Sequence, residues 1–200
     1  MKHIRIATKN LHKLREFREM LEPLGYEVAG TSRIRGFDVV EDGATFRDNA
    51  VKKARALAEL TGEPAVADDS GLVVDALGGG PGVHSARYSG VDGKHKDAAN
   101  RKKLLEALAS VPDEKRAARF VCALAYVVPG REPLVVEGRC EGVIGHEERG
   151  SGGFGYDPLF VVRDHGGRTM AELTPDEKNA VSHRGRALQA LLIGLRFGGA

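Results

Sequence analysis

Residues 65–71 have the sequence Ala-Val-Ala-Asp-Asp-Ser-Gly, and this stretch indicates the fold class. A short apolar run of strand type leads directly into two adjacent carboxylates, Asp68 and Asp69. Buried carboxylates are costly unless they are paired. In α/β sheets, carboxylates at the carboxyl end of a strand commonly face a ligand crevice. We therefore predict that a strand ends at Asp68 beside a binding site, with an Asx-type turn as the structural alternative.

Strands and helices alternate before this stretch. Residues 2–7 alternate in polarity and predict a strand, and apolar residues recurring every three or four positions over 11–24 predict a helix that ends at Gly25. A second strand is expected at 26–29. A helix is expected to begin after a Thr45 cap and to end at Gly62.

The same alternation continues after residue 71. A helix is expected over 96–109, strands over 119–128, 134–144 and 159–162, a helix capped by Thr174 with Pro175 at its first position, and a last helix through the leucines after residue 187. Two of these strands follow each other in hairpin order. The sequence therefore predicts an α/β fold with a mixed sheet flanked by helices, in one domain covering 1–200.

Composition excludes several classes of protein. The chain has 200 residues, 42% hydrophobic and 29% charged, with a formal charge of +2, so global disorder is not expected. No basic stripe interleaved with aromatic residues suggests a nucleic-acid partner. No apolar run approaches the roughly 18 residues that span a membrane, and the N-terminus lacks the apolar region of a signal peptide. Cys122 and Cys140 lack C-x-x-C spacing and predict buried free thiols in a reducing cytoplasm.

The segment after the first strand has the features of an anion site. Thr8-Lys9-Asn10-Leu11-His12-Lys13 opens the first helix, so backbone N–H groups and a lysine face its N-terminal end. The glycines of a P-loop are absent, which rules out Walker-type binding. The alternative is a helix cap by Thr8 or Asn10 with solvated lysines.

Acidic residues precede the second helix at Glu41-Asp42, where they could simply complement the helix dipole. Mg²⁺ is typically held by one or two carboxylates together with substrate phosphates. The adjacent carboxylates of Asp68 and Asp69 are therefore compatible with a metal site.

A glycine-rich segment follows at 150–158, and it matches G-x-G-x-x-G at Gly150, Gly152 and Gly155. We reject a dinucleotide site because no buried strand precedes the segment and no helix can follow it smoothly. A loop that closes around a flat ligand is the better interpretation. Phe154 could stack on a base, which is worth roughly 1–3 kcal/mol, or could lie in the core.

Donor side chains gather near the last two predicted helices. Lys178 could reach phosphate, and Ser182-His183-Arg184 offers donors suited to carbonyl oxygens, with a solvated helix face as the alternative. No G-x-S-x-G motif is present, and His84 and His95 lack partners at zinc-ligand spacing.

Five motifs in order then resemble those of the inosine triphosphate pyrophosphatase family, over nearly the whole chain. They are Thr8-x-Asn10-x-x-Lys13, Asp68-Asp69-Ser70-Gly71-Leu72, Ser85-Ala-Arg-Tyr-Ser-Gly90, Gly152-Gly-Phe-Gly-Tyr-Asp-Pro158 and Ser182-His183-Arg184. The resemblance implies a mixed sheet with two lobes around a long cleft, and a homodimer. It also implies Mg²⁺-dependent cleavage of non-standard purine nucleoside triphosphates such as ITP, dITP and XTP to the monophosphate and pyrophosphate.

The resemblance also implies roles for individual residues. Glu41 and Asp69 would hold the metal, and Asp69 would accept the proton of the attacking water. Substrate contacts are expected from the residues Thr8, Lys9, Asn10, Leu11, His12, Lys13, Ser70, Phe154, Gly155, Tyr156, Asp157, Lys178, His183 and Arg184.

Two observations on single residues and two alternative functions belong with this assignment. Leu11 and His12 stand where the family often has small residues, and Lys53 matches a lysine expected near the phosphates. One rival is a related pyrophosphatase acting on modified pyrimidine nucleotides. The other is a nucleotide-binding regulator without turnover, against which the presence of both acidic ligands argues.

Overall fold

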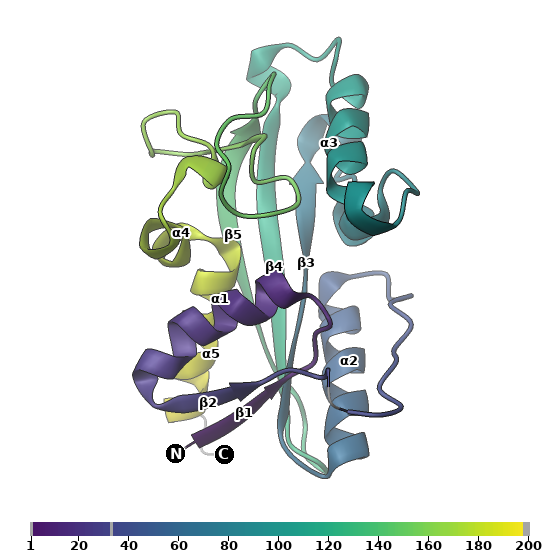
Figure 1. Cartoon of the computed structure of the whole chain (residues 1–200), viewed down its shortest axis with the longest axis vertical. Coiled ribbons are helices and arrows are strands. Elements are labelled where there is room, and N and C mark those ends of the chain that lie inside the picture. Colours follow the sequence, from purple (N-terminus) through teal and green to yellow (C-terminus); the bar gives the residue numbers. More distant parts are fainter. Residues whose placement is uncertain (1, 33, 198–200) are drawn as a thin grey trace. The chain divides into compact units, whose positions relative to one another are not determined.

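The computed structural model describes residues 2–32 and 34–197. Within them the strands and α-helices follow one another along the chain as labelled in Figure 1. In order they are β1 (Lys2–Ile6), α1 (Leu11–Leu21), β2 (Tyr26–Ala29), α2 (Phe46–Thr61), β3 (Ala65–Val74), α3 (Lys96–Ala107), β4 (Ala117–Val127), β5 (Leu134–Ile144), β6 (Phe160–Val162), α4 (Pro175–Val181) and α5 (His183–Phe197).

The strands form one sheet in the order β2-β1-β3-β4-β5-β6. Strand β1 is parallel to both of its neighbours, with Ile4 opposite Val28 of β2 and Ile6 opposite Val66 of β3. Strands β5 and β6 are antiparallel, with Val143 opposite Val161. The sheet is therefore mixed, which confirms the predicted α/β class.

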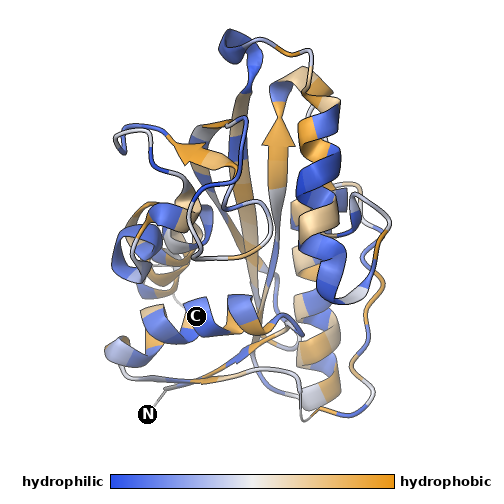
Figure 2. Cartoon of the chain, turned by 45° about the horizontal axis from the view of Figure 1, so that its top comes forward, coloured by the Kyte–Doolittle hydropathy of each residue, from blue (hydrophilic) through white to orange (hydrophobic). Residues whose placement is uncertain are grey.

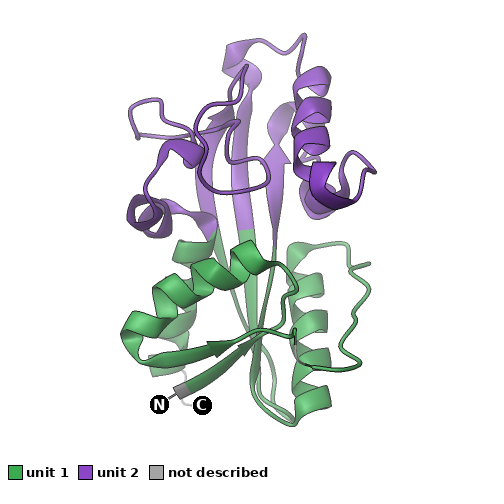
Figure 3. Cartoon of the chain, viewed as in Figure 1, with its two compact units in different colours: residues 1–69, 122–138, 184–200 green, residues 70–121, 139–183 purple. Residues whose placement is uncertain are grey.

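The chain divides into two compact units, coloured separately in Figure 3. Unit 1 consists of residues 1–69, 122–138 and 184–200, and unit 2 of residues 70–121 and 139–183. Each unit is thus built from separate stretches of sequence. The single domain over 1–200 and the long cleft stay predictions.

Helix boundaries follow the predicted capping residues. The side chain of Thr45 accepts from the backbone N–H of Asp48 to begin α2, and Gly62 ends that helix in the left-handed conformation at φ 69°. Thr174 begins α4 in a complete capping box with Glu177. The predicted helix over 11–24 is α1 followed by one 3-10 turn, Glu22–Leu24, which Gly25 closes.

The predicted end of the third strand is wrong. Strand β3 does not stop at Asp68 but continues to Val74, with Leu72 and Val74 fully buried. Local polarity suggested a terminus, yet a strand needs only paired backbone groups, and buried carboxylates are tolerated where charged partners surround them. Asp68 and Asp69 therefore lie in the middle of a strand.

Unit 1 packs helices on both faces of its strands. One cluster joins Val66 of β3 and Leu124 of β4 to Phe17 of α1 and Leu188 of α5. A second cluster joins the neighbouring strand residues, among them Ala67, to the alanines and Leu57 of α2. Because successive strand side chains point to opposite faces, α1 and α5 cover one face and α2 covers the other. Figure 2 shows α1 and α2 with both hydrophilic and hydrophobic colouring, as such half-buried helices require.

Unit 2 has its own core, in which Leu72, Leu104, Phe120 and Phe160 belong to one cluster. Beside it lies a buried arginine that donates hydrogen bonds to backbone carbonyls. Arg116 donates to the carbonyls of Ile144, Gly145 and Leu108 at 2.7, 2.9 and 2.8 Å. This guanidinium joins the end of α3 to the end of β5 through backbone oxygens.

Cys122 and Cys140 are free and buried, as predicted. Burial raises the pKa of Cys122 to about 12, so this thiol is inert at neutral pH. In the described part of the chain, no helix has the length and apolar character needed to cross a membrane.

Replacing Arg116 with Met should lower the free energy of unfolding by about 3 kcal/mol or more, since two buried carbonyls, those of Ile144 and Leu108, and the partly buried carbonyl of Gly145 lose their donor. Chemical denaturation measures the change. Arg119→Met is the control, because Arg119 pairs with the half-exposed Asp75 and should contribute less than about 1 kcal/mol. Equal losses in both variants would contradict a structural role for the Arg116 hydrogen bonds.

Candidate active site

The centre of the candidate site in unit 1 is the pair Asp68 and Asp69 in β3. They are adjacent in a strand, so their side chains point to opposite faces of the sheet. Asp68 lies on the face covered by α1 and α5, and Asp69 on the face covered by α2. Both are buried. The two carboxylates therefore have different partners.

Asp68 belongs to a buried network of ion pairs. Lys13 Nζ lies 2.7 Å from its Oδ2, and the guanidinium of Arg184 lies 3.3 Å from the same oxygen. Arg184 also pairs with Glu16. Burial alone would raise the pKa of Asp68, but the positive charges of Lys13 and Arg184 hold this pKa well below its usual value. Asp68 is thus a fixed negative charge between α1 and α5.

The start of α1 holds Lys13 in its first turn. Asn10 caps the helix, and its side chain accepts from the backbone N–H groups of His12 and Lys13 at 2.9 and 3.3 Å. The Thr8 hydroxyl accepts from the N–H of Asn10 at 3.1 Å. The capping alternative is therefore observed. It does not exclude phosphate binding, because a helix N-terminus has further N–H groups and Lys13 has three donors.

Asp69 faces α2 and Glu41. Lys53 Nζ lies 2.7 Å from Glu41 Oε1 and 3.5 Å from Asp69 Oδ1. Asn49 donates to Asp69 Oδ2 at 3.0 Å. Burial raises the pKa of Asp69 above its usual value, although Lys53 and Asn49 act in the opposite direction. Burial would lower the pKa of Lys53, but the surrounding carboxylates raise it. Lys53 therefore stays charged.

Glu41 and Asp69 present the donor set that a magnesium ion prefers. Each places a carboxylate oxygen beside the ammonium group of Lys53. The two carboxylates therefore face one common position. Among the described residues, no group of three or more His, Cys, Asp or Glu side chains is arranged to hold a metal ion. Two carboxylates complemented by substrate phosphates are the usual way in which Mg²⁺ is bound. The residues present thus fit the predicted metal.

The glycine-rich loop of unit 2 is organised by Asp157. Its Oδ2 accepts from the backbone N–H of Phe154 at 2.9 Å and from Lys178 Nζ at 2.7 Å. Lys178 also lies over the ring of Phe154, with 5.0 Å between Nζ and the centroid. A Cβ on Gly153 would lie only 2.0 Å from Asp157 Oδ2. The structure therefore brings together three predicted residues, Phe154, Asp157 and Lys178.

Helix α3 holds the same loop from another direction. Asp97 accepts from the backbone N–H of Gly155, and Arg101 donates to the Gly155 carbonyl, each at 2.9 Å. The hydroxyl of the buried Tyr156 donates to the carbonyl of Ser85 at 2.9 Å. Both polar groups of the Gly155 backbone are thus held by side chains of one helix.

The remaining predicted residues divide between the units. His183, in unit 2, stacks on Phe120 with ring centroids 4.8 Å apart, and Ser70 is half-buried in β3 of the same unit. Arg184, the next residue after His183, lies in unit 1, where it pairs with the carboxylates of Glu16 and Asp68. Its role as a substrate contact stays a prediction.

Three predicted residues of the first segment are exposed. Lys9 forms an ion pair with Asp38 at 2.9 Å, with both side chains more than half exposed. Leu11 is exposed over 73% of its surface, and His12 is also exposed. These side chains are accessible, and their contacts with substrate stay predictions.

Sequence reasoning missed Asn49, Glu16 and the α3 pair Asp97 and Arg101. Glu16 lies on the buried face of α1, between the apolar positions Leu14 and Phe17, and a carboxylate on such a face is a signal of a buried partner. Asn49 sits in the first turn of α2, where an asparagine suggests only local capping. Its contact with Asp69 spans 20 residues and had no local signal.

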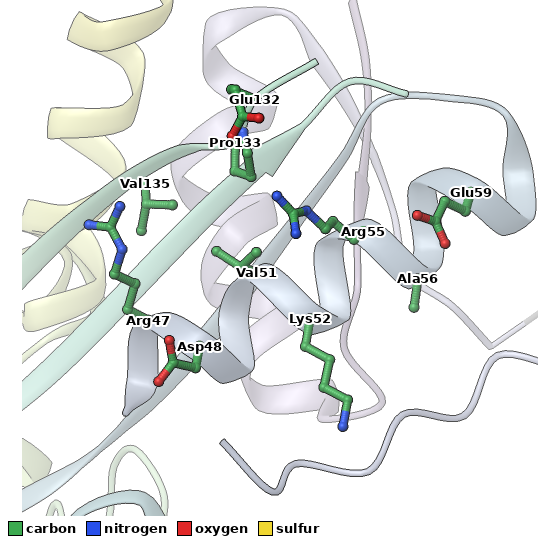
Figure 4. A pocket seen from close by; sticks show the side chains of 10 residues that line it. All are labelled: Arg47, Asp48, Val51, Lys52, Arg55, Ala56, Glu59, Glu132, Pro133 and Val135. Carbon is green, nitrogen blue, oxygen red and sulfur yellow. The ribbon is translucent and has the colours of Figure 1, made fainter. Parts of the chain in front are cut away.

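A hollow on the solvent side of α2 contains none of the predicted site residues. It is lined by charged side chains of α2 together with residues 132–135, as Figure 4 shows. Arg47, Lys52 and Arg55 are all exposed there. Such a surface of long charged side chains is ordinary solvated helix face.

Comparisons with known proteins bear on the family and the fold of the chain. Residues 4–193 match the model of the Ham1 family. The chain is 54% identical over 192 residues to a Geobacillus kaustophilus protein named dITP/XTP pyrophosphatase, with 96% of this chain and 93% of the relative covered. It is 49% identical over 200 residues to a protein of that name from Escherichia coli O157:H7, with 99% and 100% covered. A solved Coxiella burnetii HAM1 protein is similar at TM-score 0.87 and 45% identity, covering 98% of this chain and 99% of that one.

Glu16→Gln should lower the free energy of unfolding by about 3–5 kcal/mol, because it leaves a buried arginine with one charged partner fewer. Chemical denaturation measures the loss. The matched control is Glu19→Gln on the same helix, where Glu19 pairs with the exposed Arg15 and should contribute less than about 0.5 kcal/mol. A Glu16 variant as stable as the control would show that the Arg184 network does not stabilise unit 1.

Proposed function

The chain belongs to the Ham1 family, and on that premise we propose that it hydrolyses non-standard purine nucleoside triphosphates to the monophosphate and pyrophosphate. It is a dITP/XTP pyrophosphatase, which removes deaminated purine nucleotides such as ITP, dITP and XTP from the nucleotide pool. The observation that supports the mechanism best is the arrangement of Glu41 and Asp69 around Lys53, with both carboxylates at hydrogen-bond or ion-pair distance from one ammonium group.

We propose that the first turn of α1 binds the phosphates. Lys13 has one buried partner, Asp68, and its ammonium group retains donors for a second anion. The backbone N–H groups of α1 and the dipole of that helix favour negative charge at the same end. Thr8 and Asn10 shape this turn, and Lys9, Leu11 and His12 would contact the substrate from its exposed side.

Glu41 and Asp69 would hold Mg²⁺, which when bound neutralises phosphate charge and favours departure of pyrophosphate. Asp69 would accept the proton of the water that attacks phosphorus, as the bond between the α and β phosphates breaks. Its raised pKa suits this role, because a more basic carboxylate takes up a proton more readily. Lys53, next to both carboxylates, would help to keep Asp69 ionised between turnovers.

In unit 2, Phe154, Gly155, Tyr156 and Asp157 would line the nucleoside pocket, with Ser70 and Lys178 as further substrate contacts. His183 and Arg184 would complete the base and phosphate contacts. Hypoxanthine and xanthine carry a carbonyl acceptor at purine position 6 where adenine carries an amino donor. A donor of the protein at that position gains a hydrogen bond from the oxo bases and is left unpaired opposite adenine.

The proposal includes a homodimer, as the resemblance of the sequence motifs implied, and action in the cytoplasm, where the substrates are found. The two buried free cysteines are compatible with a reducing compartment.

The decisive experiment measures pyrophosphate release from ITP. Wild-type protein should be active with Mg²⁺, inactive in EDTA, and active again when Mg²⁺ is restored. Asp69→Asn should keep its thermal stability within a few degrees and lose at least 10²-fold in kcat, since a positioned base typically contributes 10²–10⁴-fold. Glu63→Gln, which changes an exposed carboxylate of the same unit that pairs with Arg5, should keep wild-type kcat.

Full turnover in EDTA would remove the metal from the mechanism. Wild-type turnover by Asp69→Asn would transfer the role of base to another group. A protein that binds ITP with Mg²⁺ but never releases pyrophosphate would be a nucleotide-binding regulator.

The base preference should show as a kcat/KM for ITP and XTP at least about 10²-fold above that for ATP, because a mismatched buried donor rejects a base strongly. His183→Leu keeps an apolar side chain against Phe120 but removes the imidazole donors. This variant should reduce kcat/KM for ITP more than kcat/KM for ATP, so the ratio of the two values should fall. His146→Leu, at an exposed histidine paired with Asp113, should leave the ratio unchanged. If His183→Leu reduces kcat/KM equally for all substrates, the histidine supports the fold or binds the phosphates and does not read the base.

A further inference from the structure

A buried amide connects the two proposed metal ligands. Asn49 lies in the first turn of α2 and is 1% exposed. Its Nδ2 donates to Asp69 Oδ2 at 3.0 Å, and its Oδ1 accepts from the backbone N–H of Gly43 at 2.8 Å. A carboxylate only accepts and a backbone N–H only donates, so these two partners fix the orientation of the amide.

The first consequence concerns the rotation of Asp69. Its Oδ2 is held by a neutral donor, so Oδ1 is the oxygen near the Lys53 ammonium, at 3.5 Å. Rotation of the carboxylate would break the hydrogen bond from Asn49 and leave a buried amide donor unpaired. Asn49 thereby fixes the plane of the Asp69 carboxylate, so that the oxygen not bonded to Asn49 is directed to the position shared with Glu41.

The second consequence concerns the segment that carries Glu41. Gly43 follows Glu41 by two residues, and a Cβ added to it would lie 2.7 Å from Asn49 Oδ1 and 2.9 Å from Asp48 Cβ. The backbone at Gly43 has no positive φ, so the glycine is required here for close approach and not for its conformation. The segment 41–43, which carries Glu41, therefore packs directly against the Asn49 amide.

We propose that Asn49 is a positioning residue that orients Asp69 and the Glu41 segment together, so that both carboxylates face one divalent cation. This inference rests on the proposed metal-dependent function. Asparagine is a weak helix former compared with alanine, so local helix stability does not account for a buried amide at this position. A role in holding Asp69 and the Glu41 segment in fixed relative positions does account for it. Hydrogen bonds to the ligands play this role at many metal sites.

The test measures Mn²⁺ binding without turnover. Wild type, Asn49→Ala and Asn49→Leu are titrated with Mn²⁺ in the presence of the non-hydrolysable inosine α,β-imidotriphosphate, and free Mn²⁺ is measured by electron paramagnetic resonance. Both Asn49 variants should bind Mn²⁺ roughly 10–100-fold more weakly than wild type, the range seen when such supporting hydrogen bonds are removed. Their kcat for ITP should fall, with a smaller change in KM.

The matched control is Thr45→Ala, which removes the cap of the same helix without touching Asn49 or Asp69. It should lower the melting temperature and leave Mn²⁺ affinity and kcat at wild-type values, which separates positioning from general stability. Gly43→Ala approaches the amide from its other end and should weaken Mn²⁺ binding in the same direction, so the inference stays testable if an Asn49 variant fails to fold.

Two failures are distinguishable. If wild type binds Mn²⁺ and the Asn49 and Gly43 variants bind it equally well, the inference is overturned and the proposed function is untouched. If wild type itself binds no Mn²⁺ with the nucleotide present, the metal assignment is overturned and the inference falls with it. Equal weakening in Thr45→Ala would also overturn the inference, since it would assign the effect to the stability of α2.

Discussion

The alternation of side chains along β3 is the constraint on which unit 1 depends. Two adjacent carboxylates in a strand cannot share one environment, because the backbone sends them to opposite faces of the sheet. Asp68 therefore meets α1 and α5, where Lys13 and Arg184 bind it. Asp69 meets α2 and the Glu41 segment. One short acidic sequence thus supplies a fixed structural charge on one face and, on the other, the carboxylate that we propose as the catalytic base.

Charge balance explains why such a site is stable before any substrate arrives. On the α2 face, Lys53 lies between Glu41 and Asp69, and on the other face Lys13 and Arg184 neutralise Asp68. Breaking one buried pair leaves an uncompensated charge, which is far more costly than losing a surface ion pair. The lysines nevertheless keep N–H donors for phosphate, because an ammonium group has three of them. The charges of the network can therefore be balanced internally and still leave room for the polyanion and the divalent cation that we propose as ligands.

Local signals predicted much of the fold and fewer of the site contacts. Thr45, Thr174 and Gly62 mark helix ends by backbone chemistry confined to a few residues, so their positions were predictable. The continuation of β3 through Asp68 was not, since it depends on partners from α1 and α5 that no local window contains. Asn49 was missed for the same reason. The resemblance of short motifs indicated the chemistry, whereas the supporting contacts come from positions far apart in the sequence.

The glycine-rich loop shows how a motif can match for a different physical cause. Its spacing is that of a dinucleotide fingerprint, in which glycines allow the backbone to approach a pyrophosphate. Here Gly150 and Gly152 are required because a Cβ on either would lie within 2.6 and 2.9 Å of the Ala171 backbone, and Gly155 is held at its N–H and its carbonyl by Asp97 and Arg101. The first two glycines of the motif thus let another backbone segment of the protein itself approach the loop. Hydrogen bonds of this kind restrict the loop before any ligand binds, which the proposed discrimination between bases by single hydrogen bonds would require.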